Sequence, residues 1–440
     1  MAQTAPLPGP WTPGLYNMLR FGFTPTSFAR ENVQKFGLTW RLKGTPATTV
    51  FTADPENVRR IFAADPSVFM PFAPDTLLNV FGPRSVIMVG GTPHRRLRKL
   101  MMPPLHGARL RSYGESMAQL AARQIGALQP ADKLRVHDLT TRYTMSVILR
   151  TVFGVEDAAE TGELREILER MVSGISAVTI FLPALQTPRF PPWARHLDTQ
   201  RRFDAWLTRT IAARRHRATD GDDVLSLLMA TRDEDGAPRD DDEIRDQLLT
   251  LLLAGHETTA ISLATAVQRL LHAPAVLSRL RDELGPGVTD PEEARAHPYL
   301  SAVLDETLRI DPIVTDVLRV VREPFELSPG VVLQPGEQVS ALIEALHRLP
   351  SIYPEPERFR PERFLERKFA PYEFVPFGGG ARRCLGAAFS DYESRIFLAE
   401  FVRRVRVEAV HPEPDARVRR NITMGPKRGV PIRVRSVHPS

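Results

Sequence analysis

Residues 377–386 read FGGGARRCLG and contain the single cysteine of the chain, Cys384. Three consecutive glycines allow the backbone to approach a flat ligand closely and to take up positive φ angles. Two arginines precede the cysteine, and a helix-like run, AAFSDYESRIFLAEF, follows it. Cationic neighbours and a helix N-terminus both favour the thiolate over the thiol. The stretch therefore predicts a metal ligand or a nucleophile, because an inert buried cysteine would need neither the glycines nor the cations.

Composition narrows the class of protein. The chain has 440 residues, 42% of them apolar and 25% charged, which is enough to bury a large core. A single cysteine excludes intramolecular disulfides and a zinc site built mainly from thiolates. The net charge of +6 is carried without a dense Lys/Arg tract or an aromatic ladder, which argues against nucleic acid as a partner. The N-terminus lacks the pattern of a signal peptide, and no stretch reaches the roughly 18 to 20 apolar residues that span a bilayer, so we expect a cytoplasmic protein without a membrane anchor.

The pattern along the chain predicts a mainly α protein with small β sheets, organised as a single domain over residues 1–440. Residues 1–36 are Pro-rich and are expected to lie as an ordered arm over the body. Two alternating runs, residues 38–42 and 48–52, predict a hairpin. From residue 54 to about residue 284, apolar positions recur at intervals of three and four, which indicates helices.

Two Pro-rich interruptions divide the helical pattern, at residues 69–91 and 173–193. Long apolar loops in compact folds often form lids or binding walls, and loops that cap the core are an equal alternative. The longest helical segment begins at the acidic residues 240–243 and continues to about His272. It would extend about 48 Å at 1.5 Å per residue. Its middle, LLTLLLAGHETTAISLA, is apolar nearly all round, so we expect it to be buried.

Residues 254–259, AGHETT, place Glu257 and Thr258 inside this apolar helix. An unpaired carboxylate or hydroxyl is costly in such a position, and a threonine in a helix can bond a preceding carbonyl and bend the helix. A polar notch of this kind suits a water molecule or a diatomic ligand. On its own, a Glu-Thr pair in a helix is usually a surface feature.

The cysteine stretch resembles the cysteine-loop signature of cytochromes P-450, Phe-x-x-Gly-x-Arg-x-Cys-x-Gly, at every specified position. The matching residues are Phe377, Gly380, Arg382, Cys384 and Gly386. The resemblance implies the cytochrome P-450 fold, with a helical body, a long central helix and a small β-rich region. It also implies haem b as the cofactor, with Cys384 as the axial iron ligand that favours O–O cleavage. The glycines, including Gly378, would leave room beneath the porphyrin, and Arg382 would face a propionate. Ser390 stands where many members have alanine.

The AGHETT stretch is similar to the oxygen-activation motif of the same family, Ala/Gly-Gly-x-Asp/Glu-Thr. This resemblance implies that Glu257 and Thr258 are catalytic and deliver protons during oxygen activation. Ala254 and Gly255 would leave space for dioxygen beside the haem. The oxygen-activation motif alone is weak evidence for the family, but together with the cysteine loop it is strong evidence.

Residues 91–100, GTPHRRLRKL, place His94 and Arg98 four positions apart, and therefore on one face of a helix. By resemblance to bacterial members of the family, both side chains are expected to bind haem propionates. Arg319, in a strand expected farther along the chain, is a further candidate for the same role.

Glu306 and Arg309 lie three apart in YLSAVLDETLRIDP, a helix that is expected to end at Pro312. An exposed ion pair is the ordinary interpretation of such a pair. Resemblance to the family's Glu-x-x-Arg motif implies instead a structural triad, closed by the arginine of a downstream Pro-Glu-Arg-Phe. Two copies of that tetrapeptide are present, and the spacing favours Arg363, with Arg358 in reserve. The triad would support the cysteine loop without being catalytic.

The resemblance implies a haem-thiolate monooxygenase that inserts one oxygen atom of O2 into a small apolar substrate such as a fatty acid, terpenoid or steroid. Electrons would come from separate proteins, a ferredoxin or flavodoxin with an NAD(P)H reductase. A basic patch is expected to dock an acidic carrier; its members are Arg95, Arg96, Lys99 and Arg109. Thr315 and Asp316 could each receive a polar group of the substrate. The segments expected to contact substrate are residues 69–86, 175–185, 249–258, 313–317 and 423–424.

Three alternatives stay open at this point. A peroxygenase would use hydrogen peroxide without redox partners, but that subgroup usually lacks the acid–alcohol pair. A haem-binding sensor or carrier without turnover would not need Glu257 and Thr258 to deliver protons. An enzyme with a cysteine nucleophile would need a positioned base, which the sequence does not place.

Overall fold

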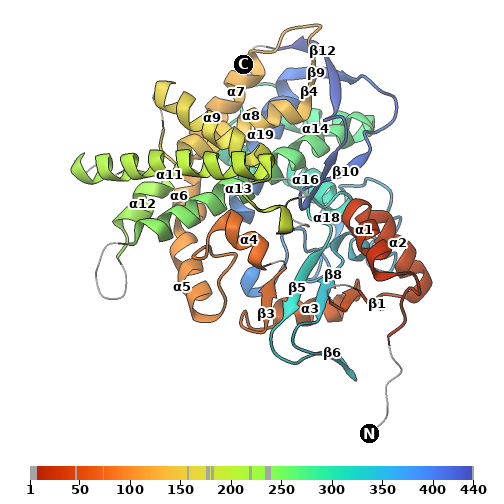
Figure 1. The fold of residues 1–440 in the computed structure, drawn as a ribbon. Helices are drawn as coiled ribbons and strands as arrows, with labels where there is room; N and C mark the ends of the chain where they lie inside the picture. The colour runs from red at the N-terminus through yellow and green to blue at the C-terminus, as the bar shows by residue number, and fades with distance from the viewer. Residues whose placement is uncertain are drawn as a thin grey trace.

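The computed structural model describes residues 7–44, 47–72, 74–155, 158–174, 179, 183–217, 221–232 and 239–438. Helices make up most of the body (Figure 1). The strands of the largest sheet lie with α1, α2 and α3 at the lower right of the view, whereas β4, β9 and β12 lie at its top, near the C-terminus. The helices and short 3-10 turns up to α12 are α1 (Gly14–Phe23), α2 (Pro25–Phe36), α3 (Pro55–Ala63), α4 (Pro74–Phe81), α5 (Gly91–Met101), η1 (Pro103–Leu105), α6 (Gly107–Ser112), α7 (Gly114–Gly126), α8 (Val136–Thr151), α9 (Ala158–Gly174), η2 (Pro183–Leu185), α11 (Pro191–Arg217) and α12 (Val224–Ala230). Those that follow are α13 (Asp241–Leu271), α14 (Pro274–Leu284), α15 (Pro291–Ala296), α16 (Pro298–Ile310), α17 (Ile343–Leu346), α18 (Arg363–Glu366), η3 (Gly380–Arg382) and α19 (Ala387–Arg404).

The described strands form one sheet of five and three smaller sheets, with the orders β1-β2-β8-β5-β3, β10-β11, β4-β12-β9 and β6-β7. In the largest sheet, β1 and β2 pair as an antiparallel hairpin with Thr39 opposite Thr52, which confirms the predicted hairpin. A fold that is mainly helical with small sheets is likewise confirmed. The strands are β1 (Thr39–Leu42), β2 (Thr49–Thr52), β3 (Phe69–Pro71), β4 (Lys133–Arg135), β5 (Val317–Val321), β6 (Phe325–Ser328), β7 (Val331–Leu333), β8 (Gln338–Ala341), β9 (Val405–Ala409), β10 (Arg417–Arg420), β11 (Thr423–Pro426) and β12 (Pro431–Val437).

The long helix α13 has the extent that the sequence predicts. Asp240 caps it by accepting a hydrogen bond from the backbone N–H of Asp242, and the acidic first turn opposes the positive end of the helix dipole. By length and composition alone, α13 could cross a membrane, and it is the one such helix in the described part of the chain. In its most apolar window 67% of the residues are buried inside the protein, so α13 is a core helix.

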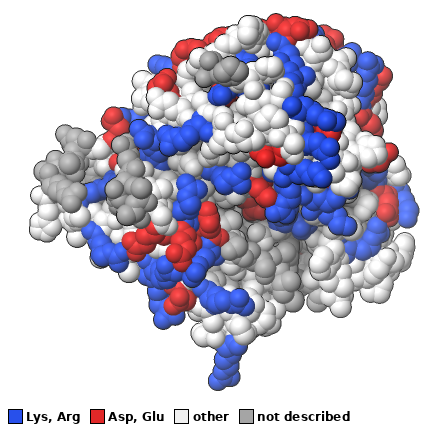
Figure 2. Space-filling view, turned by 90° about the horizontal axis from the view of Figure 1, so that it is seen from above, with Lys and Arg blue, Asp and Glu red and all other residues white. Residues whose placement is uncertain are grey.

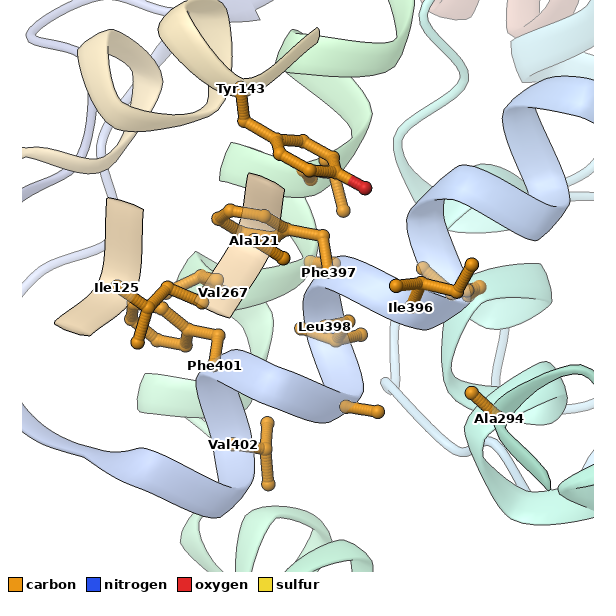
Figure 3. Close-up of a cluster of buried hydrophobic side chains, with 14 of the residues drawn as sticks. Ala121, Ile125, Tyr143, Val267, Ala294, Ile396, Phe397, Leu398, Phe401 and Val402 are labelled. Atoms are coloured by element: carbon orange, nitrogen blue, oxygen red, sulfur yellow. The ribbon is translucent and has the colours of Figure 1, made fainter. Parts of the chain in front are cut away.

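The two largest groups of buried apolar side chains share α8 and α13. The first group joins α7, α8, the C-terminal half of α13 and α19, with Tyr143 and Phe397 at its centre, their rings 4.7 Å apart (Figure 3). The second group joins α8, α9, α11 and the N-terminal half of α13, around Phe153 and Trp206. The central helix is therefore held by apolar packing on both of its halves.

Two Pro-rich segments contain regular structure. The described part of the Pro-rich arm is largely helical, because Pro13 and Pro25 stand at the starts of α1 and α2, where proline is well tolerated. Residues 69–91 are not one continuous loop, since they contain β3 and α4; Pro74 and Asp75 open α4 as helix-starting residues. Of the second predicted loop, residues 175–178 and 180–182 lie outside the described residues.

Candidate functional site

The cysteine loop is closed by its own backbone. The N–H of Cys384 donates to the carbonyl oxygen of Phe377 at 2.9 Å, and the N–H of Gly378 donates to Val375 at 2.9 Å. Gly378 and Gly380 have φ values of 67° and 63°, in the left-handed region that favours glycine. A Cβ atom at Gly380 would also overlap the carbonyl oxygen of Phe62 in α3. The glycines therefore let the loop turn tightly against α3, a packing role that the sequence did not reveal.

Cys384 is exposed and lies three residues before α19. The protein atoms around it raise the pKa of the thiol, whereas the N–H of Gly386 and the charges of Arg383 and Arg98 act to lower it. The predicted stabilisation of the thiolate is thus present, but desolvation outweighs it. A bound iron cation would deprotonate the thiol, because a coordinating cysteine is a thiolate.

Four cationic or titratable side chains converge beside this loop: His94 and Arg98 of α5, Arg319 of β5, and Arg382 of η3. Burial and the neighbouring Arg382 lower the pKa of Arg319 to about 10. Burial, together with these arginines, lowers the pKa of His94 to about 4. His94 is 2% exposed, and its Nδ1 has no hydrogen-bond partner among the described residues.

Across the described ranges, no carboxylate is paired with Arg98, Arg319 or Arg382. Arg382 donates instead to the carbonyl oxygen of Val89 at 2.8 Å, and its Nε has no partner there. Like charges that are partly buried and lack counter-ions are unfavourable. The two propionates of a haem are the kind of group that would offset them, so the residues present fit the cofactor that the sequence implies.

The polar notch lies in the middle of α13. Ala254 is exposed although its neighbours Leu252 and His256 are buried. The hydroxyl of Thr258 donates to the carbonyl oxygen of Ala254 at 2.7 Å. The hydroxyl of Thr259 donates in the same way to Gly255 at 3.0 Å, so both threonines make the bond to a preceding carbonyl that we expected.

A hydroxyl pair connects the notch to the helix that follows the cysteine. Thr259 Oγ1 lies 3.1 Å from Ser390 Oγ, and Ser390 is the position where many family members have alanine. The departure from the family pattern therefore adds a polar contact between α13 and α19.

Glu257 is a partly buried residue in the same notch. Burial raises its pKa above the ordinary value, whereas the charge of Arg420 and a hydrogen bond from the side chain of Asn421 act to lower it. Arg420 ends β10 and Asn421 follows it in the turn to β11. Sequence reasoning missed both residues, because nothing in the local pattern shows that this turn folds back onto α13.

The structure brings Glu306, Arg309 and Arg363 together in the interior. Arg309 binds Glu306 with two hydrogen bonds of 2.7 and 2.9 Å, and Arg363 Nε donates to Glu306 Oε1 at 3.1 Å. The side chains of all three are at most 3% exposed. Arg358 lies at the surface, where it pairs with Glu355 at 3.3 Å. The geometry therefore matches the choice of Arg363 over Arg358.

His347 links this triad to the cysteine loop. Arg309 donates to the carbonyl oxygen of His347 at 2.9 Å, and the N–H of Val375 donates to His347 Nε2 at 2.9 Å. Burial is the main reason that the pKa of His347 is lowered to about 3, so the ring is neutral and its Nε2 can accept. Since Val375 also accepts from Gly378, the contacts run without a break from Glu306 to the loop.

The walls expected to contact substrate are held by polar side chains of α13. The backbone of residues 84–86 is tied down by Asp246, which accepts from Arg84 N at 2.9 Å, and by Gln247, which accepts from Val86 N at 3.0 Å. Ser85 and Thr250 share a hydroxyl contact of 2.7 Å. These buried polar groups interrupt the apolar surface of α13 and fix the loop against it.

Two other predicted wall segments lie together. The N–H of Met424 donates to the carbonyl oxygen of Ile313 at 2.8 Å. Thr315 and Asp316 face one another, with the hydroxyl of Thr315 donating to Asp316 at 3.1 Å, and Arg419 lies 3.7 Å from the same carboxylate. A polar group of a substrate would therefore compete with contacts that already exist.

The family model of cytochrome P-450 matches residues 6–431 of the chain. This protein belongs to the cytochrome P-450 family. The resemblance that the cysteine loop implied is confirmed, and the P-450 is a haem-thiolate monooxygenase with haem b as its cofactor.

Relatives and structures are similar to this P-450 over most of its length. Cytochrome P-450 135B1 of Mycobacterium tuberculosis (strain H37Rv) is 36% identical over 396 residues, which cover 88% of this chain and 82% of the relative. Cytochrome P-450 135A1 of the same strain is 35% identical over 439 residues, 97% of this chain and 94% of the relative. The structure of retinoic acid-bound cyanobacterial CYP120A1 covers 99% of this chain and 100% of its own, with a TM-score of 0.87 at 24% identity. That likeness confirms the fold.

Proposed function

We propose that this P-450 inserts one oxygen atom of O2 into a small apolar substrate such as a fatty acid, terpenoid or steroid, while the other atom leaves as water. Electrons would reach it from a ferredoxin or flavodoxin and an NAD(P)H reductase, in the cytoplasm. The observation that carries the proposal is the notch of α13, where the partly buried Glu257 has a carboxyl of raised pKa and the next residue, Thr258, bonds the carbonyl oxygen of Ala254 with its hydroxyl. A haem carrier without turnover would not need this pair.

Cys384 would hold the iron, and His94, Arg98, Arg319 and Arg382 would face the propionates. Phe377, Gly378 and Gly386 shape the loop around the cysteine. When bound, haem supplies the iron-centred activation of dioxygen. Ala254 is exposed and carries only a methyl group, so it leaves its side of α13 open. A Cβ atom at Gly255 would lie 3.7 Å from Ile148 of α8, so the small size of Gly255 also serves the packing of the two helices.

Glu257 is suited to hold a proton, since burial raises the pKa of its carboxyl. Thr258 directs its own hydroxyl proton to the carbonyl oxygen of Ala254. Its lone pairs stay free to accept a hydrogen bond from a water molecule. The pair can therefore store a proton and orient water beside the cofactor, which is general acid catalysis by a positioned group.

One set of measurements separates this function from its rivals. The reduced, carbon monoxide-treated protein should give the Soret band typical of thiolate-bound haem, and apolar compounds should shift the spectrum of the ferric protein on titration. Turnover should be supported by a ferredoxin system and only weakly by hydrogen peroxide. Efficient turnover with peroxide alone would identify a peroxygenase. If the purified protein carries no haem, Cys384 would instead be a candidate nucleophile.

The basic patch proposed for carrier docking is largely engaged in ion pairs. Arg95 pairs with Asp65 at 3.2 Å, Arg96 with Glu243 at 2.6 Å, and Arg109 with Asp222. Lys99 is exposed and has no acidic partner in the parts of the chain that the structure describes. On the face drawn in Figure 2, basic side chains also lie among acidic ones. If an acidic carrier docks here, its carboxylates would replace the present ion-pair partners of the three arginines. At Lys99 they would form an ion pair where none exists among the described residues.

Reduction by the carrier is expected to slow as ionic strength rises, because exposed charges more than about 10 Å apart are largely screened at 0.1 M salt. Lys99→Glu should weaken carrier binding several-fold, since it replaces the unpaired cation by a like charge for the carrier. Stopped-flow reduction at increasing salt measures both effects. A rate that does not depend on salt would remove the electrostatic docking site.

A further inference from the structure

The helix α1 presents an apolar face to the solvent. Six of the twelve large apolar side chains that are exposed in the described part of the chain belong to residues 11–23: Trp11, Leu15, Tyr16, Met18, Leu19 and Phe23. The last five fall on one side of α1, whereas Asn17 and Phe21 fall on the opposite side, toward the protein. A surface helix ordinarily buries its apolar side chains and exposes its polar ones. In α1 this arrangement is reversed.

The contacts of α1 hold this face outward. The side chain of Asn17, which is buried, donates to the carbonyl oxygen and the hydroxyl of Thr12 at 3.0 and 2.8 Å. On the same inner side, the ring of Phe21 lies 5.2 Å from the ring of Phe51 in β2. The outward apolar face is therefore a fixed feature of the folded protein.

The charge around α1 suits an anionic surface. Residues 1–30 contain no Asp or Glu. Lys35, at the end of α2, and Lys43 are exposed and have no acidic partner among the described residues. A Cβ atom at Gly14 would lie 3.0 Å from the carbonyl oxygen of Lys43, so this lysine follows the chain beside the start of α1. An apolar helix face with aromatic side chains and nearby cations is typical of a helix that lies in the headgroup region of a bilayer.

A second copy of the chain fits this face less well than a lipid surface does. In a two-fold dimer the same patch meets itself, so the cations beside α1 would approach cations of the other copy. Anionic headgroups would instead attract them. In addition, α1 lies at the edge of the molecule, where a helix can enter the headgroup region while the body stays in water (Figure 1).

We propose that α1 docks this protein on the surface of an anionic bilayer, with Trp11, Leu15 and Leu19 in the headgroup region. A helix that lies on a bilayer does not span it, so this docking is reversible and differs from a membrane anchor. The inference goes beyond the proposed function and does not depend on it.

The position of α1 gives the docking a consequence for substrate. The guanidinium of Arg419 in β10 lies 5.6 Å from the ring centre of Phe21, and the N–H of Met424 in β11 donates to Ile313. The helix therefore adjoins the walls that are expected to contact substrate. An apolar compound dissolved in the bilayer would be delivered beside these walls, and this consequence, unlike the docking, rests on the proposed function.

The fluorescence of Trp11 tests the docking in the intact haem-containing protein. Trp11 is fully exposed, whereas at most 3% of the surface is exposed in each of the other tryptophans, Trp40, Trp193 and Trp206. In vesicles of phosphatidylcholine and phosphatidylglycerol, lipids brominated on their acyl chains should quench the emission of Trp11. Trp11→Phe should remove this quenching. If brominated lipids do not quench the wild type, α1 does not enter the bilayer.

Leu15→Glu and Leu19→Glu should each weaken co-sedimentation with the same vesicles about tenfold, because the burial of one leucine is worth at least that factor. Val288→Glu is the matched control, since Val288 is 68% exposed between α14 and α15, and it should bind vesicles as the wild type does. All three variants should keep the haem spectrum and the melting temperature of the wild type.

Binding that neither leucine variant weakens, or that Val288→Glu weakens equally, would contradict the docking through α1. Size-exclusion chromatography without lipid tests the other occupant. A dimer that Leu19→Glu dissociates, together with no quenching of Trp11 by brominated lipids, would show that the face binds a second copy and that the bilayer proposal is wrong. None of these measurements requires turnover, so their failure is distinct from failure of the proposed function.

Discussion

Replacing Glu306 with Ala is expected to give a protein that does not retain haem. Arg309 and Arg363 both bind this carboxylate in the interior, and the change leaves two buried guanidinium groups without a counter-ion. Removal of one partner from a buried ion pair typically costs about 3–5 kcal/mol, a large share of the roughly 5–15 kcal/mol that stabilises a domain. The haem absorbance per protein and the thermal unfolding of the purified variant measure the effect.

The second Pro-Glu-Arg-Phe copy supplies a control for this prediction. Arg358→Ala removes an exposed ion pair with Glu355, for which the expected cost is below about 1 kcal/mol. The backbone carbonyl of Arg358, which Arg363 and Arg309 approach at 3.3 and 3.4 Å, stays in place. Normal haem content in Glu306→Ala, or its loss in Arg358→Ala, would contradict the structural role that we assign to the triad.

Replacing Thr258 with Ala is expected to preserve haem binding and to uncouple oxygen consumption from product formation. The variant loses the hydroxyl that we propose to orient water next to Glu257, while the helix keeps its backbone bonds. A positioned proton donor contributes about 10²- to 10⁴-fold to the step it serves, so product per NAD(P)H should fall at least about tenfold and peroxide should rise. Oxygen, peroxide and product are measured in the same reaction.

Thr259→Ala is the matched control for Thr258→Ala. Thr259 also bonds a carbonyl four residues earlier, but its hydroxyl is directed to Gly255 and Ser390 rather than to Ala254. The control removes one hydroxyl that bonds a preceding helix carbonyl in the same way and leaves Glu257 and Thr258 intact. Unchanged coupling in Thr258→Ala, or equal uncoupling in both variants, would show that Thr258 has no special part in proton supply.

The features that could be predicted from sequence are those whose residues lie close together along the chain. The cysteine loop, the notch in α13 and the pair Glu306–Arg309 each occupy fewer than about a dozen consecutive positions, so spacing alone carries the argument. The extent of α13 was predictable for the same reason, because its acidic start and its proline stop are both local signals.

What escaped prediction depends on contacts between distant segments. Arg420 and Asn421 act on the pKa of Glu257 only because the last hairpin folds back across α13. Asp246 and Gln247 look like interruptions of an apolar helix until the backbone of residues 84–86 is seen to bind them. The helix α4 was missed because prolines in residues 69–91 suggested a loop, although Pro74 starts a helix. Local patterns do not encode such long-range partners.

The central helix α13 is held by apolar packing in its N-terminal and C-terminal halves but not in the stretch between them. Leu252 is its last member of one apolar group and Leu263 its first member of the other. Between them, Ala254, Glu257 and Thr258 belong to neither group and are not fully buried, so the apolar packing does not depend on their side chains. Glu257 and Thr258 keep their place because α13 is packed on both sides of them, so substitutions of these two polar side chains should leave the apolar core intact.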